Sequence, residues 1–243
     1  MMENLKDNLD SGRRFVLGQI KSSRLELDFF NLYAWLLRLI EGKKVLDVAC
    51  GSGLGSFLLA HKAEQVLGID LSEEVIAYAR ERYSLPNLQF EAADIFDYHL
   101  PQASFDVIVS ALTIEQMEPQ KQEEFLRKLK TAMAPGALMI LVTPNKKVTS
   151  PSGRIGNKWN EREFSKSELE KTLRSVGLEP LEWFGQRAVF FMFTTYFFRK
   201  ILGLVQKVSG KNLGFYGRRE SSEIKKLKFY RQPKEFVVLI TKK

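Results

Sequence analysis

A glycine-rich stretch followed by two spaced carboxylates marks the part of this sequence that could do chemistry. The stretch reads Asp47-Val-Ala-Cys-Gly51-Ser-Gly53-Leu-Gly55 and begins at the end of an apolar run. Glycines at such a point let the backbone turn tightly and let a ligand approach without a Cβ in the way. Asp70, 19 residues after Gly51, could accept hydrogen bonds from both hydroxyls of a ribose. Asp94 could accept one from an adenine amino group, so the spacing predicts a nucleoside-containing ligand.

Two kinds of cofactor fit this arrangement, and the residues around the glycines favour one of them. A dinucleotide needs Gly-x-Gly-x-x-Gly, because its pyrophosphate lies at a helix N-terminus. This chain instead has Gly51-x-Gly53-x-Gly55, with Ser56 where the last glycine should be. Asp47 precedes the glycines, where a carboxylate would repel a phosphate and attract an ammonium group. Both differences favour S-adenosylmethionine, which carries positive charge and no phosphate.

The elements that must position these residues alternate along the chain. Periodicity predicts strands at 44–49, 65–70, 87–91, 105–110, 137–143, 178–184 and 235–241, and helices at 24–41, about 54–62, 73–83, 119–133 and 165–176. Strands alternating with helices indicate a mostly parallel, doubly wound sheet with helices on both faces. Ligands of such sheets bind beyond the carboxyl ends of the strands, which is where Asp70 and Asp94 fall.

The order of these motifs resembles a class I S-adenosylmethionine-dependent methyltransferase of the type 11/12 kind. The resemblance covers residues 40–185 and rests on VLDVACGSGLGS, VLGIDLS, EAADI, FDVIVSALTIEQM and LKTAMAPGALMILVTPN. It implies a Rossmann-like α/β fold with a seven-stranded sheet whose last strand is antiparallel. It also implies cofactor contacts at Asp47, Ala49, Gly51, Gly53, Asp70, Leu71, Asp94, Ile95 and Ser110. Many members have glycine at the position of Ala49, a change that a small residue should tolerate.

A narrower resemblance is to bacterial methyltransferases from cell-surface glycan gene clusters. It rests on Arg14-Phe-Val, the TIEQM and TPNK segments, Asn157, Arg162-Glu-Phe-Ser and Gly185-Gln186. Those proteins usually have Glu-His where this chain has Glu115-Gln116, and often a second histidine at the position of Asn160. The resemblance implies O-methylation of a glycan or a lipid-linked small acceptor.

Glu115 is the candidate for proton handling, because it follows the fourth predicted strand by a few residues. An acceptor should meet the activated methyl group there, and a carboxylate could take its proton. The other interpretation is that Glu115 only holds its own loop, and the sequence does not separate the two. Positioning and desolvation can accelerate an in-line methyl displacement without a dedicated base.

Cysteine and histidine content argues against thiol and metal chemistry. Cys50 is the only cysteine, and no activating base is visible beside it, so packing is its favoured role. The two histidines, His61 and His99, are too few for a histidine metal site, and we expect no metal.

Positive charge is concentrated late in the chain. Residues 186–231 carry a net charge of +9 and 10 of the 28 aromatic residues, whereas the rest of the chain has a net charge of −1. We therefore expect a cofactor-binding core at 1–185, a basic, aromatic and largely helical insertion at 186–232, and the final strand at 233–243. The insertion could be a lid, an amphipathic contact with an anionic membrane or a partner surface. Nucleic acid is disfavoured, because the aromatic residues are bunched together.

The composition, with 44% hydrophobic and 27% charged residues, is typical of a soluble globular protein. The polar N-terminal segment predicts no signal peptide, and no apolar run is long enough for a membrane helix. We expect a cytoplasmic protein, with peripheral membrane contact as the alternative. Three functions stay open: O-methylation of a glycan or lipid-linked acceptor, methylation of a quinone-like or lipid small molecule, and S-adenosylmethionine binding without turnover. The oligomeric state is not predicted.

Overall fold

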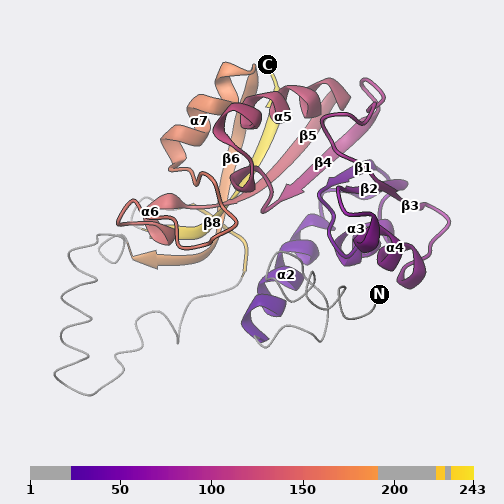
Figure 1. Ribbon diagram of the computed structural model, residues 1–243, viewed down its shortest axis with the longest axis horizontal. Coiled ribbons are helices and arrows are strands. Elements are labelled where there is room, and N and C mark those ends of the chain that lie inside the picture. Colours follow the sequence, from indigo (N-terminus) through magenta and orange to yellow (C-terminus); the bar gives the residue numbers. More distant parts are fainter. Residues whose placement is uncertain (1–22, 191–222, 228–230) are drawn as a thin grey trace.

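The computed structural model describes residues 23–190, 223–227 and 231–243, which form one mixed β-sheet flanked by helices (Figure 1). The strands in these ranges are β1 (Lys44–Val48), β2 (Gln65–Asp70), β3 (Leu88–Ala92), β4 (Phe105–Ala111), β5 (Met133–Pro144), β6 (Leu178–Phe190), β7 (Lys225–Lys226) and β8 (Arg231–Lys242). Their order across the sheet is β3-β2-β1-β4-β5-β8-β6-β7.

Helices cover both faces of the sheet. They are α2 (Ser23–Leu36), α3 (Leu54–Ala60), α4 (Glu73–Arg82), α5 (Pro119–Ala132), α6 (Lys146–Thr149) and α7 (Lys166–Ser175), with a single 3₁₀ turn, η1 (Ile114–Gln116). Helices α2, α3 and α4 pack on one face, and α5 and α7 pack on the other (Figure 1).

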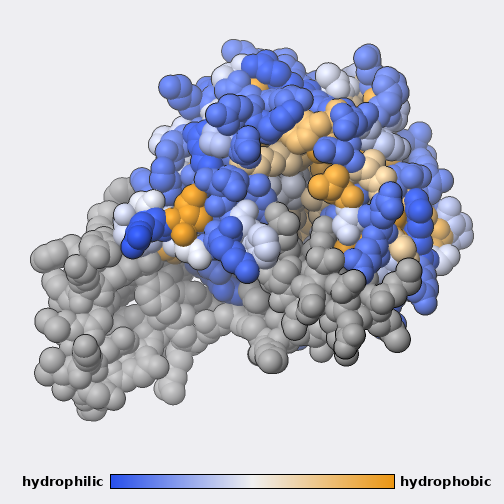
Figure 2. All heavy atoms as spheres, viewed as in Figure 1, coloured by the Kyte–Doolittle hydropathy of each residue, from blue (hydrophilic) through white to orange (hydrophobic). Residues whose placement is uncertain are grey.

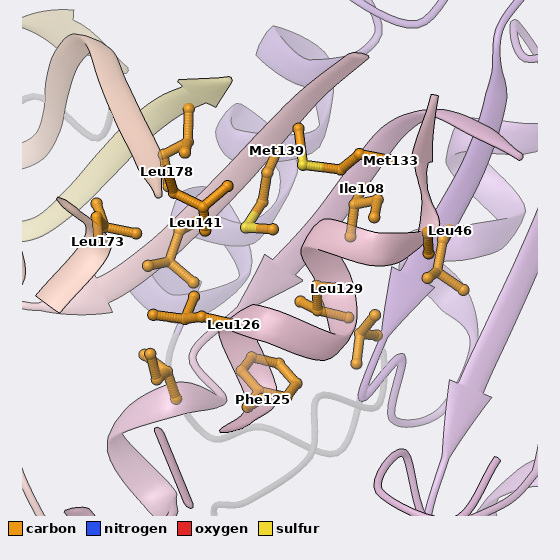
Figure 3. Packing of buried hydrophobic residues seen from close by; sticks show 14 of the residues in the cluster. Leu46, Ile108, Phe125, Leu126, Leu129, Met133, Met139, Leu141, Leu173 and Leu178 are labelled. Atoms are coloured by element: carbon orange, nitrogen blue, oxygen red, sulfur yellow. The ribbon is translucent and has the colours of Figure 1, made fainter. Parts of the chain in front are cut away.

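The larger core lies between the sheet and α5. In α5, Phe125, Leu126 and Leu129 lie on one side of the helix and are fully buried. They pack toward Met139 and Leu141 of β5 (Figure 3). Burial of each such side chain contributes roughly 1.5–3 kcal/mol, so this contact fixes α5 on the sheet and with it the loop that precedes α5.

Strand direction brings the motif residues to one edge of the sheet. Strands β1 to β5 are mutually parallel, and β8 is antiparallel to both β5 and β6. Val48 at the end of β1 pairs with Ile69 of β2 and Ser110 of β4, so the carboxyl ends of these three strands are neighbours. The loops that leave this edge carry the predicted cofactor residues.

The doubly wound α/β fold with an antiparallel last strand is confirmed, although several elements differ from their predicted bounds, such as α2, which ends at Leu36 rather than at residue 41. The described sheet has an eighth strand, because Lys225 and Lys226 pair with β6 at its outer edge. Strand β6 continues to Phe190 rather than ending at residue 184, since β8 begins at Arg231 and supplies its pairing partners. Residues 186–190, which we assigned to the insertion, therefore extend the sheet.

The rest of the predicted insertion, residues 191–222 and 228–230, lies outside the described residues. Its expected helical structure and its lid, membrane or partner roles stay predictions. Within the described ranges, no helix is both long enough and apolar enough to span a membrane.

Candidate functional site

The loop between β1 and α3 carries the predicted glycines in the conformation that needs them. Ala49, Gly51 and Gly53 have φ values of 58°, 57° and 81°. This left-handed region favours glycine, and an alanine there costs roughly 1–2 kcal/mol, so Ala49 is tolerated under strain. A Cβ at Gly53 would lie 2.6 Å from the Cβ of Ala79 and 2.8 Å from the ring of Phe90. Close packing against α4 and β3 therefore requires this glycine, a reason that the sequence did not reveal.

Asp70 holds this loop from the end of β2. The Gly51 N–H donates to Asp70 Oδ2 at 2.9 Å, and the Ser72 N–H donates to Oδ1 at 3.1 Å. Ser72 is also the N-cap of α4. Asp70 is also of the right type for ligand hydroxyls, since a carboxylate accepts hydrogen bonds at both of its oxygens. Its expected ribose contact stays a prediction, but the carboxylate is already fixed in orientation.

Asp47 lies buried beneath the same loop. Its side chain is 2% exposed and accepts a hydrogen bond from Ser56 Oγ at 2.7 Å. The pKa of Asp47 is raised to about 7, mainly by burial, with a smaller contribution from the Asp70 carboxylate and against the lowering effect of the hydrogen bond from Ser56. The charged neighbour that acts on Asp47 is thus another carboxylate. Such a group is stabilised by a positively charged ligand and destabilised by a phosphate.

Tyr33 of α2 contacts Gly55 in the first turn of α3, directly after this loop, and no pattern in the sequence indicated this contact. Any Cβ at Gly55 would collide with the Tyr33 hydroxyl and ring, so the tyrosine packs directly on the Gly55 backbone. Burial raises the pKa of Tyr33 well above its usual value, and Asp47 and Cys50 raise it further. Helix α2 therefore packs on the start of α3 beside the glycine loop, and the buried tyrosine stays neutral near Asp47.

Cys50 does not have the environment of a reactive thiol. Burial raises the pKa of the Cys50 thiol well above its usual value, and Asp47 and Asp70 raise it further. A neutral thiol is a poor nucleophile, which agrees with the packing role expected from the sequence. No group of three His, Cys, Asp or Glu side chains arranged for a metal ion occurs in the described ranges.

The other predicted cofactor residues lie at the same edge. Asp94 follows β3 and accepts the Phe96 N–H through Oδ1 at 2.9 Å. Ile95 beside it is buried, whereas Leu71 at the end of β2 is 68% exposed. Ser110 is fully buried in β4, and its hydroxyl has no hydrogen-bond partner among the described residues. The structure thus brings the predicted set together around the ends of β1, β2, β3 and β4.

Glu115 lies in η1, on the face of the sheet that α5 covers. Its Oε2 accepts a hydrogen bond from Thr143 Oγ1 at 3.0 Å. Its backbone oxygen accepts the N–H groups of Glu161 at 2.8 Å and Arg162 at 3.1 Å. The pKa of Glu115 is raised to about 8, mainly by burial and to a smaller extent by nearby carboxylates such as Glu163. These contacts are those of a loop anchor, and proton transfer to Glu115 stays a prediction.

A second buried carboxylate, Glu163, holds the loop that covers Glu115. It accepts hydrogen bonds from Ser150 Oγ at 2.7 Å, from Asn160 Nδ2 at 2.9 Å and from the Thr149 hydroxyl. Asn160 occupies the position where the glycan-cluster proteins often have histidine, and here it supports this loop. Glu163 stood in the sequence only as part of the Arg162-Glu-Phe-Ser segment, and its role was not predicted, because its partners Thr149, Ser150 and Asn160 lie 3 to 14 residues earlier in the chain.

A buried ion pair joins α2 to the end of β6. Asp28 pairs with Arg187, and Gln186 Nε2 donates to the Asp28 backbone oxygen at 2.8 Å. Arg187 has a φ of 51°, a strained conformation for a residue with a side chain. Burying an ion pair brings little net stability, but this one fixes the position of α2 over the carboxyl edge. Neither residue belongs to a motif that the sequence displays.

Comparison with known proteins supports the resemblance to S-adenosylmethionine-dependent methyltransferases. Residues 45–136 match a family model described as a methyltransferase domain. A Mycolicibacterium smegmatis protein named a probable S-adenosylmethionine-dependent methyltransferase is 32% identical over 149 residues, which are 61% of this chain and 56% of that protein. This chain therefore spans little more than half the length of that relative. A 2-heptyl-1-hydroxyquinolin-4(1H)-one methyltransferase of Mycobacteroides abscessus is 28% identical over 159 residues, 62% of this chain and 70% of that protein.

A solved S-adenosylmethionine-dependent methyltransferase of Archaeoglobus fulgidus shares the fold. Its TM-score is 0.63 at 16% identity, covering 100% of this chain and 99% of the other. The family that the sequence motifs indicate is thus confirmed by the domain match, the relatives and the fold. The chain contains a class I S-adenosylmethionine-dependent methyltransferase domain.

Proposed function

We propose that this protein transfers the methyl group of S-adenosylmethionine to a small-molecule acceptor. The observation that carries the proposal is the pair of carboxylates at one sheet edge, with Asp70 fixed by two backbone N–H groups and Asp47 buried under the glycine loop. Asp70 would accept the ribose hydroxyls and Asp47 would face the positively charged methionine part. Leu71, Asp94 and Ile95 would flank the adenine.

The residues present fit this cofactor. Asp47 is a buried carboxyl whose charged neighbour is another carboxylate, Asp70. A positively charged ligand group beside Asp47 would therefore stabilise its ionised form. The buried Ser110 hydroxyl, without a partner among the described residues, could bond a polar ligand group at the same edge. A dinucleotide would instead place its pyrophosphate next to two carboxylates.

The chemistry divides between the cofactor and the chain. When bound, S-adenosylmethionine supplies an electrophilic methyl group on a sulfonium. The chain would bind and orient the reactants, and Tyr33 of α2 would help to exclude water beside the glycine loop, since it packs on Gly55 directly after that loop. Glu115 keeps η1 and the loop above it in place, because its carboxyl accepts from Thr143 Oγ1 and its backbone oxygen accepts from the amides of Glu161 and Arg162.

Two acceptor classes remain within this proposal. The narrower sequence resemblance favours an oxygen of a glycan or lipid-linked small molecule. The Mycobacteroides abscessus relative is named for a hydroxyquinolone, which supports the quinone-like or lipid class. Binding of S-adenosylmethionine without product, across acceptors of both classes, would indicate a non-catalytic binding protein instead.

Replacement of Asp70 by Ala is expected to weaken S-adenosylhomocysteine binding by roughly 1–3 kcal/mol, about 5- to 150-fold, because hydrogen bonds to a charged acceptor are lost. Isothermal titration calorimetry measures the effect. Asp106 is a matched control, since its Oδ2 also accepts a backbone N–H, that of Lys44, at 2.9 Å, but at the opposite edge of the sheet. Unchanged affinity in D70A, or an equal loss in D106A, would refute the ribose assignment.

Binding of S-adenosylmethionine is expected to release protons near neutral pH. The pKa of Asp47 is about 7 in the free protein, and a positive ligand lowers it by favouring the charged carboxylate. About half a proton should therefore leave at pH 7, and affinity should rise with pH through this value. Calorimetry in two buffers of different ionisation enthalpy detects the proton, and D47N should abolish the difference. Identical heats for the wild type would contradict a cation beside Asp47.

A further inference from the structure

Leu112 combines backbone strain with exposure. Its φ is 56°, and its side chain is 42% exposed. The left-handed conformation costs a bulky residue roughly 1–2 kcal/mol. Both of its backbone groups are bonded, since its N–H donates to the Val142 oxygen at 2.8 Å and its oxygen accepts from Gln116 Nε2 at 2.7 Å. The surroundings thus hold the strain in place, as happens mostly at functional sites.

Leu112 lies where the acceptor side of the site must be. It follows β4 directly, and β4 pairs with β1 through Ser110 and Val48, so it lies at the end of the strand next to the glycine loop. The residues proposed for the adenosine follow β2 and β3, on the other side of β1. The sheet order therefore leaves the β4 side of the glycine loop for the methyl group and its acceptor.

Six large apolar side chains are exposed among the described residues, and two of them lie at this edge. The face of the molecule in Figure 2 is largely hydrophilic, with apolar side chains in separate patches. In the described ranges, Leu71 and Leu112 are the large apolar side chains exposed directly after strands β2 and β4. One therefore stands on each side of the glycine loop.

We propose that Leu112 contacts the methyl acceptor and selects an apolar one, an alkylated or aromatic small molecule rather than a bare glycan. The inference rests on the proposed methyl transfer and specifies its substrate class. Binding of an alkyl or aromatic group removes the leucine side chain from water, which is favourable. A hydroxyl-rich sugar against the same side chain would lose hydrogen bonds to water without replacement, which is costly.

The chain offers a matched control for the strain. Ala103 also has a positive φ, 49°, and is exposed, and its N–H is bonded to the Thr131 oxygen at 2.9 Å. It precedes β4, so it lies at the edge opposite the proposed site. Asn tolerates the left-handed conformation, so L112N and A103N should both fold, and only L112N should alter the acceptor side.

The test uses the full chain saturated with S-adenosylhomocysteine and two probes, 2-heptyl-1-hydroxyquinolin-4(1H)-one and the same quinolone without the heptyl chain. Calorimetry should show that the wild type binds the heptyl compound at least tenfold more tightly. L112N should lose at least tenfold in affinity for it and keep its affinity for S-adenosylhomocysteine. A103N should match the wild type in both measurements.

Each of the other outcomes overturns one stated part of this inference. Equal or absent binding of the two quinolones by wild-type protein that binds S-adenosylhomocysteine overturns the apolar class. A preserved heptyl preference in L112N, or an equal loss in A103N, overturns the role of Leu112. Failure of the wild type to bind S-adenosylhomocysteine overturns the proposed function, and the inference with it.

Discussion

Replacement of Glu115 by Gln is expected to stabilise the protein at pH 8 and to have little effect at pH 4.5. Burial raises the pKa of this carboxyl from its usual 4.5 to about 8, so the folded state keeps a proton that the unfolded state releases above pH 4.5. The free energy of unfolding of the wild type therefore falls as the pH rises from 4.5 to 8. The total loss is about 1.4 kcal/mol for each unit by which the pKa of Glu115 differs between the folded and unfolded states. Glutamine stays neutral, so the gain of E115Q over the wild type should grow by about 2–4 kcal/mol between pH 4.5 and 8.

Urea unfolding at several pH values measures this gain. The same substitution at Glu118, which is exposed three residues later, should leave the pH dependence of the wild type unchanged. Turnover of the E115Q variant separates the two interpretations of Glu115. A loss of roughly 10²–10⁴-fold with intact cofactor affinity would indicate a proton acceptor, whereas near-normal turnover would indicate a loop anchor. A parallel pH dependence in E115Q and wild type would contradict the buried, neutral carboxyl.

Replacement of Gly53 by Ala is expected to destabilise the protein by roughly 2–5 kcal/mol, since strain and overpacking add at one position. The φ of Gly53 is 81°, and the new Cβ would lie 2.6 Å from the Cβ of Ala79 and 2.8 Å from the ring of Phe90. The clash is with α4 and β3, so the loss should occur without any ligand. Thermal or urea unfolding of the free protein measures it.

Gly136 separates the two contributions. Its φ is 74°, but a Cβ there would meet nothing within 4 Å. G136A should therefore show the cost of the left-handed conformation alone, roughly 1–2 kcal/mol. Equal losses in G53A and G136A would show that Ala79 and Phe90 move aside at no cost.

Local signals in the sequence predicted the elements that position the cofactor. Strand β2 has the predicted limits, because a short apolar run ends at Asp70 just before the Ser72 cap. The ends of β6 and β8 could not be predicted, since each strand is lengthened by pairing with the other and not by a local pattern. Strand β7 has only two residues, both lysines, and depends wholly on its contact with β6.

The residues of the candidate site likewise divide into those that a local motif predicts and those that depend on contacts between distant parts of the chain. The glycine loop and Asp70 follow from a compact motif and were predicted. Tyr33 reaches the loop from a helix that precedes the whole sheet, and its periodicity indicated only that the helix was amphipathic. Ser56 stood out in the sequence only as a missing glycine, and the structure shows it bonded to Asp47. Contacts of this kind depend on how separate elements meet, which spacing along the chain does not specify.

The position of β8 has a consequence for the synthesis of the protein. This strand lies between β5 and β6, although it follows both in the sequence. Until residues 231–242 have left the ribosome, β6 cannot join the sheet, and β5 presents an open edge of N–H and C=O groups. Open edges of this kind pair readily with other chains. The yield of folded protein in a cell should therefore depend on how quickly this late strand inserts between its two waiting neighbours.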